Sequence, residues 1–424
     1  MPSTDVFPAP ILTCITWMPR HMGLAPLLFH PYFLAWVHPE SSEARMTRYQ
    51  QAVEKHFASL LRAIAQGHTP TDAERRLLVS TFQVDAVQTA MTPVTPQHNA
   101  EHMVNDRLSL LRTLWRPFAQ WWQHYLQVHR TEDIPVDTLW RLYMPLSQWI
   151  VEQKRAVRPG DVYVVGMYGS QGRGKTVMAH ALVSILNHLL DPERDGQAVT
   201  RSIDDYYLSK ARREALRPLG YDAGPGASNR GPAGTHDTQW LLRNLREFRD
   251  STPASTTAVG NFQKQLDDQP QEPRIVHGKV GVFILEGWFV GAHTDFDIRR
   301  IPTGFQRTVA QYLQGDYKTI FDRLDTLWAF DTPSVDEILR NREQQERLLE
   351  QSQGKRGMSP EQIHSFVRYF YEQTWTPGVT SPIPQPKDIT FLGTIYPNRR
   401  IRMIERGGRP IGAAFPASAT AEGR

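Results

Sequence analysis

Hydrophobic residues in the first third of the chain recur at spacings of three and four, the period of an amphipathic helix. The pattern runs through Met46–Ala65, Asp72–Thr81 and Val104–Val128, and it predicts a mostly helical region over residues 43–157. Aromatic side chains follow this spacing in the third segment, which is typical of a core stripe, although a ligand-binding aromatic box is an open alternative. These side chains are Trp115, Phe118, Trp121, Trp122 and Tyr125.

The pattern changes at residue 158, where short apolar runs rich in β-branched residues begin to alternate with helical periods. Continuous apolar runs are typical of strands that are buried on both faces of a parallel sheet. The expected strands are Asp161–Gly166, Val199–Ile203, Val280–Leu285 and Thr326–Phe330, and the expected helices are Val177–Leu190, Gln239–Arg249 and Ser334–Gln353. This alternation predicts a three-layer α/β fold with a parallel sheet over residues 158–406.

Four segments show neither the helical spacing nor the apolar runs of strands. Residues 1–42 are apolar in part but are interrupted by charges and prolines, which favours a poorly ordered N-terminal arm. Pro218–Gly234 and Gln263–Gly278 are rich in turn-forming or polar residues and are expected to be long loops. Residues 407–424 are rich in Gly, Ala and Pro, which predicts a disordered tail.

Composition narrows the classes of function. The 424 residues are 40% hydrophobic and 22% charged, as in an ordinary soluble globular protein. The net charge of +4 without a basic, aromatic-interleaved stripe argues against a nucleic-acid partner. Cys14 is the single cysteine, so a disulfide within the chain is impossible. No run of 18 apolar residues exists, and we expect a cytoplasmic protein with a small-molecule partner and no membrane span.

One segment matches the phosphate-binding pattern G-x-x-x-x-G-K-[ST] in full. Glycines let the backbone wrap around phosphate oxygens, the lysine contacts the β- and γ-phosphates, and the threonine hydroxyl binds Mg²⁺. The segment follows an expected strand and precedes an expected helix, as this mechanism requires. It therefore predicts binding of ATP and Mg²⁺. Its residues are Gly169, Ser170, Gln171, Gly172, Arg173, Gly174, Lys175 and Thr176.

Carboxylates stand at the ends of two expected strands. Asp204 and Asp205 lie in the sequence SIDDYY after the second strand, and Glu286 follows the third. Open α/β sheets place their ligands at the carboxyl ends of the strands, where these side chains would meet the phosphate loop. The adjacent aspartates have a second interpretation, since such a pair also caps helices.

Two further groups carry candidate chemistry. The sequence RGPAGTHD over Arg230–Asp237 contains His236, which is suited to contact a substrate oxygen, although Asp237 would also cap the next helix. Arg340 and Arg342 lie on a charged helix. Such a face is usually solvated, yet in small kinases arginines of a mobile helix often close over the phosphates, and Arg342 is a candidate nucleotide contact.

These elements together resemble the D-glycerate 3-kinase family, a branch of P-loop kinases similar to uridine kinase and phosphoribulokinase. The similarity is closest to the longer cyanobacterial-type members, which also carry a helical N-terminal extension. The similarity covers about Leu139 to Arg402. Each motif by itself is a weak sign of the family, but the order of the whole set is specific to it. The motifs are LWRL at Leu139–Leu142, the phosphate loop, SIDDYY at Ser202–Tyr207, RGPAGTHD at Arg230–Asp237, LEGWFVG at Leu285–Gly291, RLD at Arg323–Asp325 and GMS at Gly357–Ser359.

The resemblance implies transfer of the γ-phosphate of ATP to D-glycerate, which yields 3-phosphoglycerate and requires Mg²⁺. Asp204 would be the base or orienting group for the acceptor hydroxyl, with Lys175 at the phosphates. Glu286 would act at the metal, directly or through water, together with Thr176. The residues expected at the acceptor are Asp205, Tyr207, Arg230, His236, Asp237 and Lys264.

The sequence departs from the family in Asn261–Arg274. The family carries R-F-D-K-S followed by G-x-G-D-R, whereas this chain keeps Phe262 and Lys264 but has Gln263 in place of the aspartate. The Gly-Asp-Arg element is absent, and an arginine that grips a carboxylate with two bonds is lost with it. Three hypotheses follow: a glycerate kinase, a kinase of another hydroxylated metabolite, or a non-catalytic nucleotide-binding regulator. The oligomeric state stays open.

Overall fold

The structure is a computed structural model of the chain. It describes residues 42–85, 99–158, 160–222, 229–330, 358–385, 388–395 and 401–406, with most of 336–347. The predicted arm and tail lie outside these residues, apart from Ser42, and the predicted region boundaries remain predictions. The chain divides into two compact units, residues 1–63 and 64–424. Among the described residues, no helix is long and apolar enough to span a bilayer.

The described part of the region predicted to be helical is mostly helical. The three predicted segments correspond to α2 (Ser42–Ala65), α3 (Asp72–Val84) and α5 (Ala100–Leu126). A capping box starts α3, because Thr71 accepts a hydrogen bond from the amide of Glu74 and the Glu74 carboxylate accepts one from Thr71. Shorter elements follow: η2 (Thr131–Asp133), α6 (Val136–Thr138), the π-helical η3 (Leu139–Tyr143) and α7 (Met144–Val157).

Six strands form the main sheet in the order β2-β5-β1-β6-β7-β8. The first five are parallel and β8 is antiparallel to β7, so the predicted α/β fold with a parallel sheet is confirmed. Every residue of β5, which lies between β2 and β1, is buried, as a continuous apolar run predicts. The strands are β1 (Tyr163–Tyr168), β2 (Gln197–Ser202), β5 (Val280–Gly287), β6 (Thr326–Phe330), β7 (Phe391–Ile395) and β8 (Ile401–Arg406).

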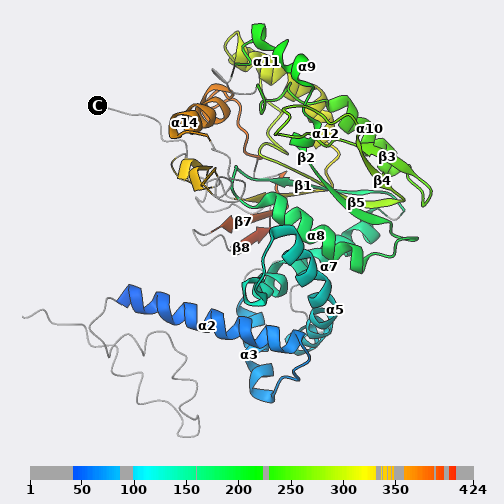
Figure 1. The fold of residues 1–424 in the computed structure, drawn as a ribbon, viewed down its shortest axis with the longest axis vertical. Coiled ribbons are helices and arrows are strands. Elements are labelled where there is room, and N and C mark those ends of the chain that lie inside the picture. Colours follow the sequence, from blue (N-terminus) through cyan, green and yellow to red (C-terminus); the bar gives the residue numbers. More distant parts are fainter. Residues whose placement is uncertain are drawn as a thin grey trace, which may run out of the picture. The chain divides into compact units, whose positions relative to one another are not determined.

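Helices cover both faces of this sheet. Figure 1 shows α7 and α8 (Lys175–Leu189) on one face, and α10 (Thr238–Arg249) and α12 (Lys318–Phe321) on the other. Helix α5 packs on α8, the helix that follows the phosphate loop. The other helical elements are η4 (Ile203–Tyr206), α9 (Lys210–Glu214), η5 (Arg217–Leu219), η6 (Ile298–Arg300), α11 (Phe305–Tyr312), η7 (Leu313–Tyr317), α14 (Pro360–Arg368) and η8 (Tyr369–Gln373).

A second, two-stranded sheet corrects the loop predicted over Gln263–Gly278. Its strands β3 (Thr256–Val259) and β4 (Arg274–His277) pair antiparallel. The prediction was wrong at its C-terminal end because a four-residue strand is too short to show a period, and the pairing with β3 supplies its backbone hydrogen bonds. The helix predicted over Ser334–Gln353 lies partly outside the described residues.

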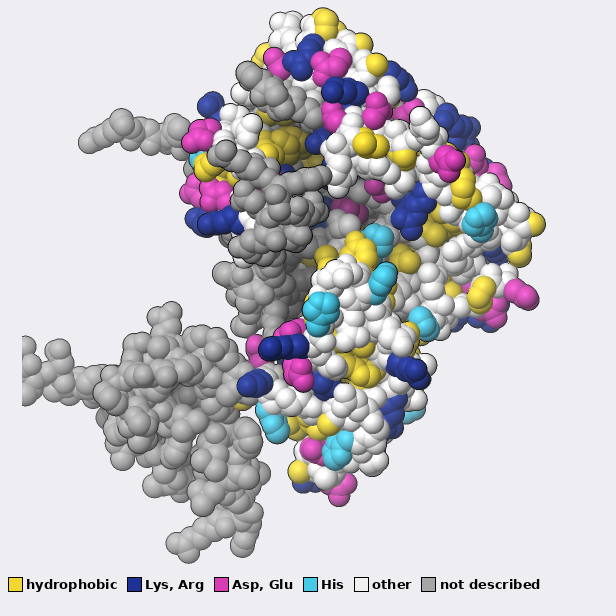
Figure 2. Space-filling view, viewed as in Figure 1, with side chains coloured by type: hydrophobic (Ala, Val, Ile, Leu, Met, Phe, Trp, Pro, Cys, Tyr) yellow, Lys and Arg dark blue, Asp and Glu magenta, His cyan; other side chains and the backbone are white. Residues whose placement is uncertain are grey.

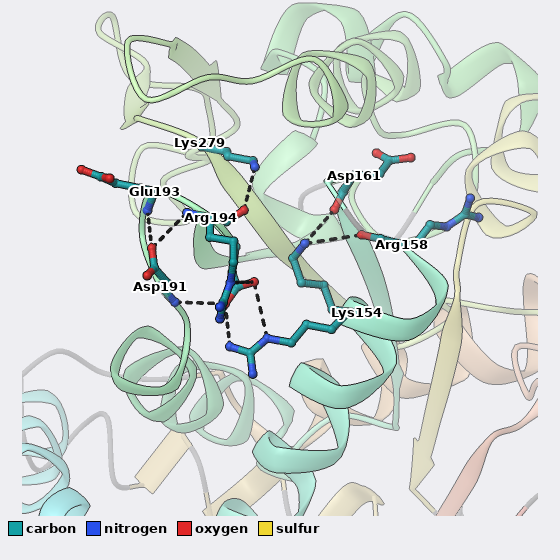
Figure 3. Close-up of polar contacts among 9 residues, drawn as sticks. Lys154, Arg158, Asp161, Asp191, Glu193, Arg194 and Lys279 are labelled. Carbon is teal, nitrogen blue, oxygen red and sulfur yellow. Dashed lines mark hydrogen bonds and ion pairs between the residues drawn. The ribbon is translucent and has the colours of Figure 1, made fainter.

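A buried lysine joins the helical region to the start of the sheet. Lys154 of α7 is 1% exposed, and its ammonium donates hydrogen bonds to the carbonyl oxygens of Arg158 at 3.4 Å and Asp161 at 3.3 Å. Figure 3 shows these two bonds closing the connection between α7 and β1. The amino-terminal end of the sheet is thereby fixed by a cation with partners on the backbone.

A buried carboxylate completes the same cluster. Asp195 is 3% exposed and accepts hydrogen bonds from Nη2 of Arg155 at 2.6 Å and Nη2 of Arg194 at 3.0 Å. The amide of Asp191 donates a further bond at 3.1 Å, so donors from three residues surround this carboxylate. Because burial alone would raise the pKa of Asp195, the two guanidiniums are what hold it well below its usual range.

Candidate functional site

The phosphate-binding loop leaves β1 and ends in α8, as its sequence predicts. Gly172 and Gly174 both have φ of 77°, a left-handed conformation that favours glycine. Lys175 is 8% exposed, and its ammonium donates a hydrogen bond to the carbonyl oxygen of Ser170 at 3.0 Å. Burial lowers the pKa of Lys175, whereas the charges of Glu286 and Asp204 raise it. The lysine thus folds back over its own loop, where phosphate groups would lie.

Close packing explains the first glycine of the loop. A Cβ at Gly169 would lie 2.9 Å from the Phe330 ring and 3.2 Å from the Lys175 side chain. Within the described part of the chain, the buried Oγ of Ser170 and Oε1 of Gln171 have no hydrogen-bond partner. Polar atoms without partners inside a loop of this shape fit a ligand that supplies them.

The predicted metal residues touch each other. The Thr176 hydroxyl donates a hydrogen bond to Oε1 of Glu286 at 2.8 Å. Glu286 is in register with Ser202 of β2 and Met167 of β1, so it sits between the two strands that lead to the other site residues. A hydroxyl and a carboxylate are hard oxygen donors that suit Mg²⁺. The described residues contain no group of three or more His, Cys, Asp or Glu around one point, but Mg²⁺ commonly uses one or two protein ligands plus phosphates and waters.

Asp204 is held as a charged group. Its Oδ2 accepts a hydrogen bond from the Lys264 ammonium at 3.0 Å, and its Oδ1 accepts one from the Tyr207 hydroxyl at 2.9 Å. Burial would raise the pKa of Asp204, but the charges of Lys264 and His236 and these two hydrogen bonds lower it to about 2. The carboxylate is therefore ionised at neutral pH and lies beside the phosphate loop.

Asp205 behaves differently from its neighbour. Its Oδ2 accepts a hydrogen bond from the amide of Ser202 at 2.9 Å and closes a capping box at the start of η4. Burial raises the pKa of Asp205 to about 6, aided by the charges of Glu286 and Asp204 and opposed by Arg201. The helix-capping interpretation of the aspartate pair thus describes Asp205, while Asp204 remains directed at Lys264 and Tyr207.

His236 is a buried side chain close to Asp204. Its Nδ1 is hydrogen-bonded to the Tyr317 hydroxyl at 2.7 Å, and its ring stacks on Tyr207 at 4.4 Å. Burial lowers the pKa of His236 to about 4, a shift that the Arg213 charge strengthens and the Asp204 charge opposes. Its Nε2 is buried and has no partner among the described residues. A neutral imidazole at this place suits a hydrogen bond to a substrate oxygen.

The segment that departs from the family lies at the site. Arg230 Nε is 3.6 Å from Oδ1 of Asp267, which also pairs with Arg213 at 3.0 Å. The guanidiniums of Arg230 and Arg213 lie over the Phe262 ring, at 5.5 and 5.2 Å from its centre. The same segment delivers Lys264 to Asp204, so it lies beside the predicted acceptor groups.

Two predicted site residues have other partners. Asp237 caps α10 by accepting a hydrogen bond from the amide of Trp240 at 3.0 Å, and its second oxygen pairs with Arg212 at 3.1 Å. Arg342 forms an ion pair with Glu346 and lies over a phenylalanine ring. Burial lowers the pKa of Arg342, and Arg230 and Asp204 are near enough to affect it. The structure therefore brings Arg342 toward the site and uses Asp237 as a helix cap.

Sequence reasoning missed several residues at this edge of the sheet. Tyr317 bonds His236 and the amide of Gly234, yet it lies in η7, where no motif marks it. Gln269 donates to the carbonyl oxygens of Asp205 and Tyr207 and so holds the SIDDYY turn. These contacts join segments far apart in the chain, and no local signal could have revealed them.

The aromatic stripe of α5 is divided between core and surface. Trp115 and Phe118 are buried, as a core stripe predicts, whereas Tyr125 is 38% exposed. The Tyr125 ring stacks with Trp121 at 5.2 Å and packs on His180 of α8 at 4.8 Å. The Tyr125 ring of α5 thus contacts α8 at His180, one helical turn after Thr176.

Comparison with known proteins gives relatives over about half of the chain. The sequence is 27% identical over 237 residues to "Uncharacterized kinase mug58" of Schizosaccharomyces pombe, covering 52% of this chain and 83% of that protein. It is 29% identical over 222 residues to "Probable ATP-dependent kinase TDA10" of Saccharomyces cerevisiae, covering 47% of this chain and 72% of that protein. No protein-family model matches the sequence.

Solved structures with a similar chain course include the YGR205w protein, with a TM-score of 0.49 and 23% identity over 62% of this chain and 96% of that one. Another is a D-glycerate 3-kinase from Cryptococcus neoformans, with a TM-score of 0.46 and 21% identity over 62% of this chain and 99% of that one. The strand order, the glycine loop and its buried lysine define an α/β protein of the P-loop type. Within that class, the chain is similar in sequence to the two fungal kinases named above.

Proposed function

We propose that the protein is an ATP-dependent kinase that transfers the γ-phosphate of ATP to a hydroxyl of a small acid or polyol, with D-glycerate as the first acceptor to test. One observation carries the proposal: Lys175, the Thr176–Glu286 pair and an ionised Asp204 meet at the carboxyl ends of β1, β5 and β2. This is the edge at which parallel α/β sheets bind ligands. The named function of the two fungal relatives supports it.

On the donor side, the chain binds and orients phosphates. The backbone amides of the loop, the N-terminus of α8 and the Lys175 ammonium neutralise the β- and γ-phosphates. Thr176 and Glu286 would hold Mg²⁺, which supplies charge neutralisation between the phosphates when it is bound. Burial of Lys175 strengthens its interaction with an anion because little water competes for it.

On the acceptor side, Asp204 orients the hydroxyl that receives the phosphoryl group. A carboxylate with a pKa of about 2 accepts a hydrogen bond well but is a weak proton acceptor. That suits phosphoryl transfer, in which positioning and charge neutralisation dominate over covalent work by the protein. Lys264 and Tyr207 hold the carboxylate in place.

The groups around Asp204 favour an acidic acceptor. Lys264 and Arg230 bring positive charge, and the neutral ring of His236 brings a hydrogen-bonding nitrogen without a partner among the described residues. A small hydroxy acid such as glycerate fits this balance of charge. The engagement of Arg230 with Asp267 favours a second candidate, a kinase of another hydroxylated metabolite, because Asp267 competes with a substrate carboxylate for the guanidinium.

The test is an acceptor screen with the full chain, ATP and Mg²⁺, in which phosphorylated products are identified by mass spectrometry. Turnover of D-glycerate at sub-millimolar concentration supports the first candidate, and turnover of a different acid or polyol alone supports the second. Binding of ATP without transfer to any acceptor of the panel would overturn the kinase proposal in favour of a nucleotide-binding regulator.

A further inference from the structure

A second group of cationic and aromatic side chains lies beside Asp205, away from Lys264. Arg201, near the end of the edge strand β2, is 7% exposed. Its Nη1 donates a hydrogen bond to the carbonyl oxygen of Thr200 at 2.7 Å, while its buried Nε has no partner among the described residues. A buried guanidinium with an unused N–H is costly unless an acceptor completes it.

Arg274 adds a second positive charge to this group. It is the exposed first residue of β4 and the last residue of the segment that departs from the family. Burial and the charge of Arg274 both lower the pKa of Arg201, whereas Asp205 raises it. In the described part of the chain, neither arginine forms an ion pair with a carboxylate. Asp205 is thus a nearby counter-charge of Arg201. Strand β4 lies beside β2, because the Gln197 side chain at the start of β2 donates a hydrogen bond to the carbonyl oxygen of His277, the last residue of β4.

Tyr125 of α5 and His180 of α8 form an aromatic pair, and α8 packs on β2, the strand that carries Arg201. His180 of α8 packs on Tyr125, and burial followed by the charges of Arg201 and Arg274 lowers the pKa of His180 to about 4. The imidazole is therefore neutral at physiological pH. Burial, with the charges of Glu286 and Asp205, raises the pKa of the Tyr125 hydroxyl, so this ring lies within electrostatic range of the site carboxylates.

In Figure 2, Lys or Arg side chains lie close to histidine and apolar side chains near the centre of the view. The four residues of this group come from α5, α8, β2 and β4, which are separate along the chain. Asp204 is bonded to Lys264 and Tyr207, whereas the carboxylate of Asp205 accepts a hydrogen bond from the amide of Ser202, the residue after Arg201, so the two aspartates have different partners.

We propose that Arg201 and Arg274 bind a carboxylate or phosphate group of the acceptor, with Tyr125 and His180 as the wall of this subsite. The inference rests on the proposed kinase function and specifies its substrate: an anionic group set apart from the hydroxyl that is phosphorylated. Two guanidiniums match the planar or tetrahedral oxygens of such a group by charge-assisted hydrogen bonds. The helical region then takes part in choosing the acceptor through Tyr125.

A binding experiment tests the subsite without phosphotransfer. The full chain is saturated with Mg²⁺ and a non-hydrolysable ATP analogue to fill the phosphate loop, and inorganic phosphate is titrated by calorimetry. We expect one further phosphate to bind, and R274Q to weaken it at least about tenfold. R299Q, which alters an exposed arginine elsewhere, is the matched control and should bind as the wild type does. Equal binding by R274Q and the wild type, or no binding up to about 10 mM phosphate, overturns the subsite.

Kinetics with the acceptor found in the screen test its role. Arg201 is buried and its replacement could unfold the protein, so the test uses R274Q and Tyr125→Ala instead. Thermal unfolding of both variants checks that they are folded. We expect KM for the acceptor to rise about tenfold or more, KM for ATP to stay unchanged, and phosphate to compete with the acceptor. Non-competitive inhibition, or an unchanged acceptor KM, overturns the assignment to the acceptor. Phosphate binding in a protein that transfers to no acceptor would instead overturn the kinase proposal and leave the anion site standing.

Discussion

Both ends of the main sheet bury charged groups, but the two ends differ in whether these groups have hydrogen-bond partners. At the amino-terminal end, the Lys154 ammonium has two backbone acceptors and the Asp195 carboxylate has donors from three residues. At the carboxyl end, buried polar atoms of Ser170, Arg201 and His236 have no partner among the described residues. The same sheet therefore carries a completed polar cluster at one end and an incomplete one at the other.

The difference separates scaffold from site. A buried polar atom without a partner costs free energy, on the order of 1–3 kcal/mol. At the amino-terminal end the buried polar groups have hydrogen-bond partners and stabilise the fold. At the carboxyl end the groups without partners cost stability, which indicates that they serve ligand binding. Substitutions at the carboxyl end should thus reduce turnover more than stability, and substitutions at the amino-terminal end should do the reverse.

The largest effect is expected at the phosphate loop. Lys175→Ala removes the buried cation that neutralises the β- and γ-phosphates, and phosphotransfer should fall by about a thousandfold or more. Steady-state kinetics with the acceptor from the screen measure this loss. Lys318→Ala removes an exposed lysine of α12 and should leave turnover unchanged. Equal turnover of Lys175→Ala and the wild type would remove the loop from the mechanism.

Asp204→Asn should have the next largest effect. The amide keeps the size of the side chain but loses the charge that aligns the acceptor hydroxyl, so kcat should fall about a hundredfold. The affinity for ATP, measured by equilibrium binding, should change little because Asp204 faces Lys264 and Tyr207. Asp322→Asn, which changes an exposed carboxylate, is the control. A drop in ATP affinity without a drop in kcat would contradict the assigned role.

At the other end of the sheet, Asp195→Ala should reduce stability and leave catalysis intact. The substitution removes a buried carboxylate whose arginine partners are themselves 44% and 66% exposed and can return to water. The free energy of unfolding should therefore fall by about 2–3 kcal/mol, near the lower limit of the cost of removing one partner from a buried ion pair. Chemical denaturation measures the loss, and kcat and KM of the folded variant should match the wild type. A loss of turnover in fully folded protein would mean that the two ends are coupled.

The smallest effect is a pH dependence at His236. Its pKa is about 4 in the folded chain and about 6.5 when unfolded, so the unfolded state binds the proton first as pH falls. This contribution to stability is present at neutral pH, declines below about 6.5, and is fully lost below about 4. From pH 7 to pH 5 the wild type should lose about 2 kcal/mol from this group.

Denaturation of the wild type and His236→Gln at both pH values isolates this contribution, because other titrating groups are common to the two proteins. The glutamine can still bond the Tyr317 hydroxyl but cannot titrate. The loss on acidification should be smaller in the variant by about 2 kcal/mol. Identical pH dependence in the two proteins would show that the imidazole is not held neutral by burial.

Local sequence determined much of the fold and the donor half of the site. The strands Thr326–Phe330 and Val280–Gly287 and the helices from Asp72, Lys175 and Thr238 follow from apolar periods within a few turns of chain. The phosphate loop is likewise contiguous, since its chemistry needs glycines and a lysine within eight residues. Such features depend on neighbours along the chain, and the sequence displays them directly.

Only the tertiary structure decided which of two adjacent aspartates pairs with Lys264 and which caps a helix turn. That outcome depends on Lys264, sixty residues from Asp204, and on the different surroundings of Asp205. The contact of Thr176 with Glu286 spans 110 residues. The contact of Tyr125 with His180 likewise comes from the packing of α5 on α8. Burial and long-range charge set these pKa values and partners, and neither is encoded in the spacing of residues along the chain.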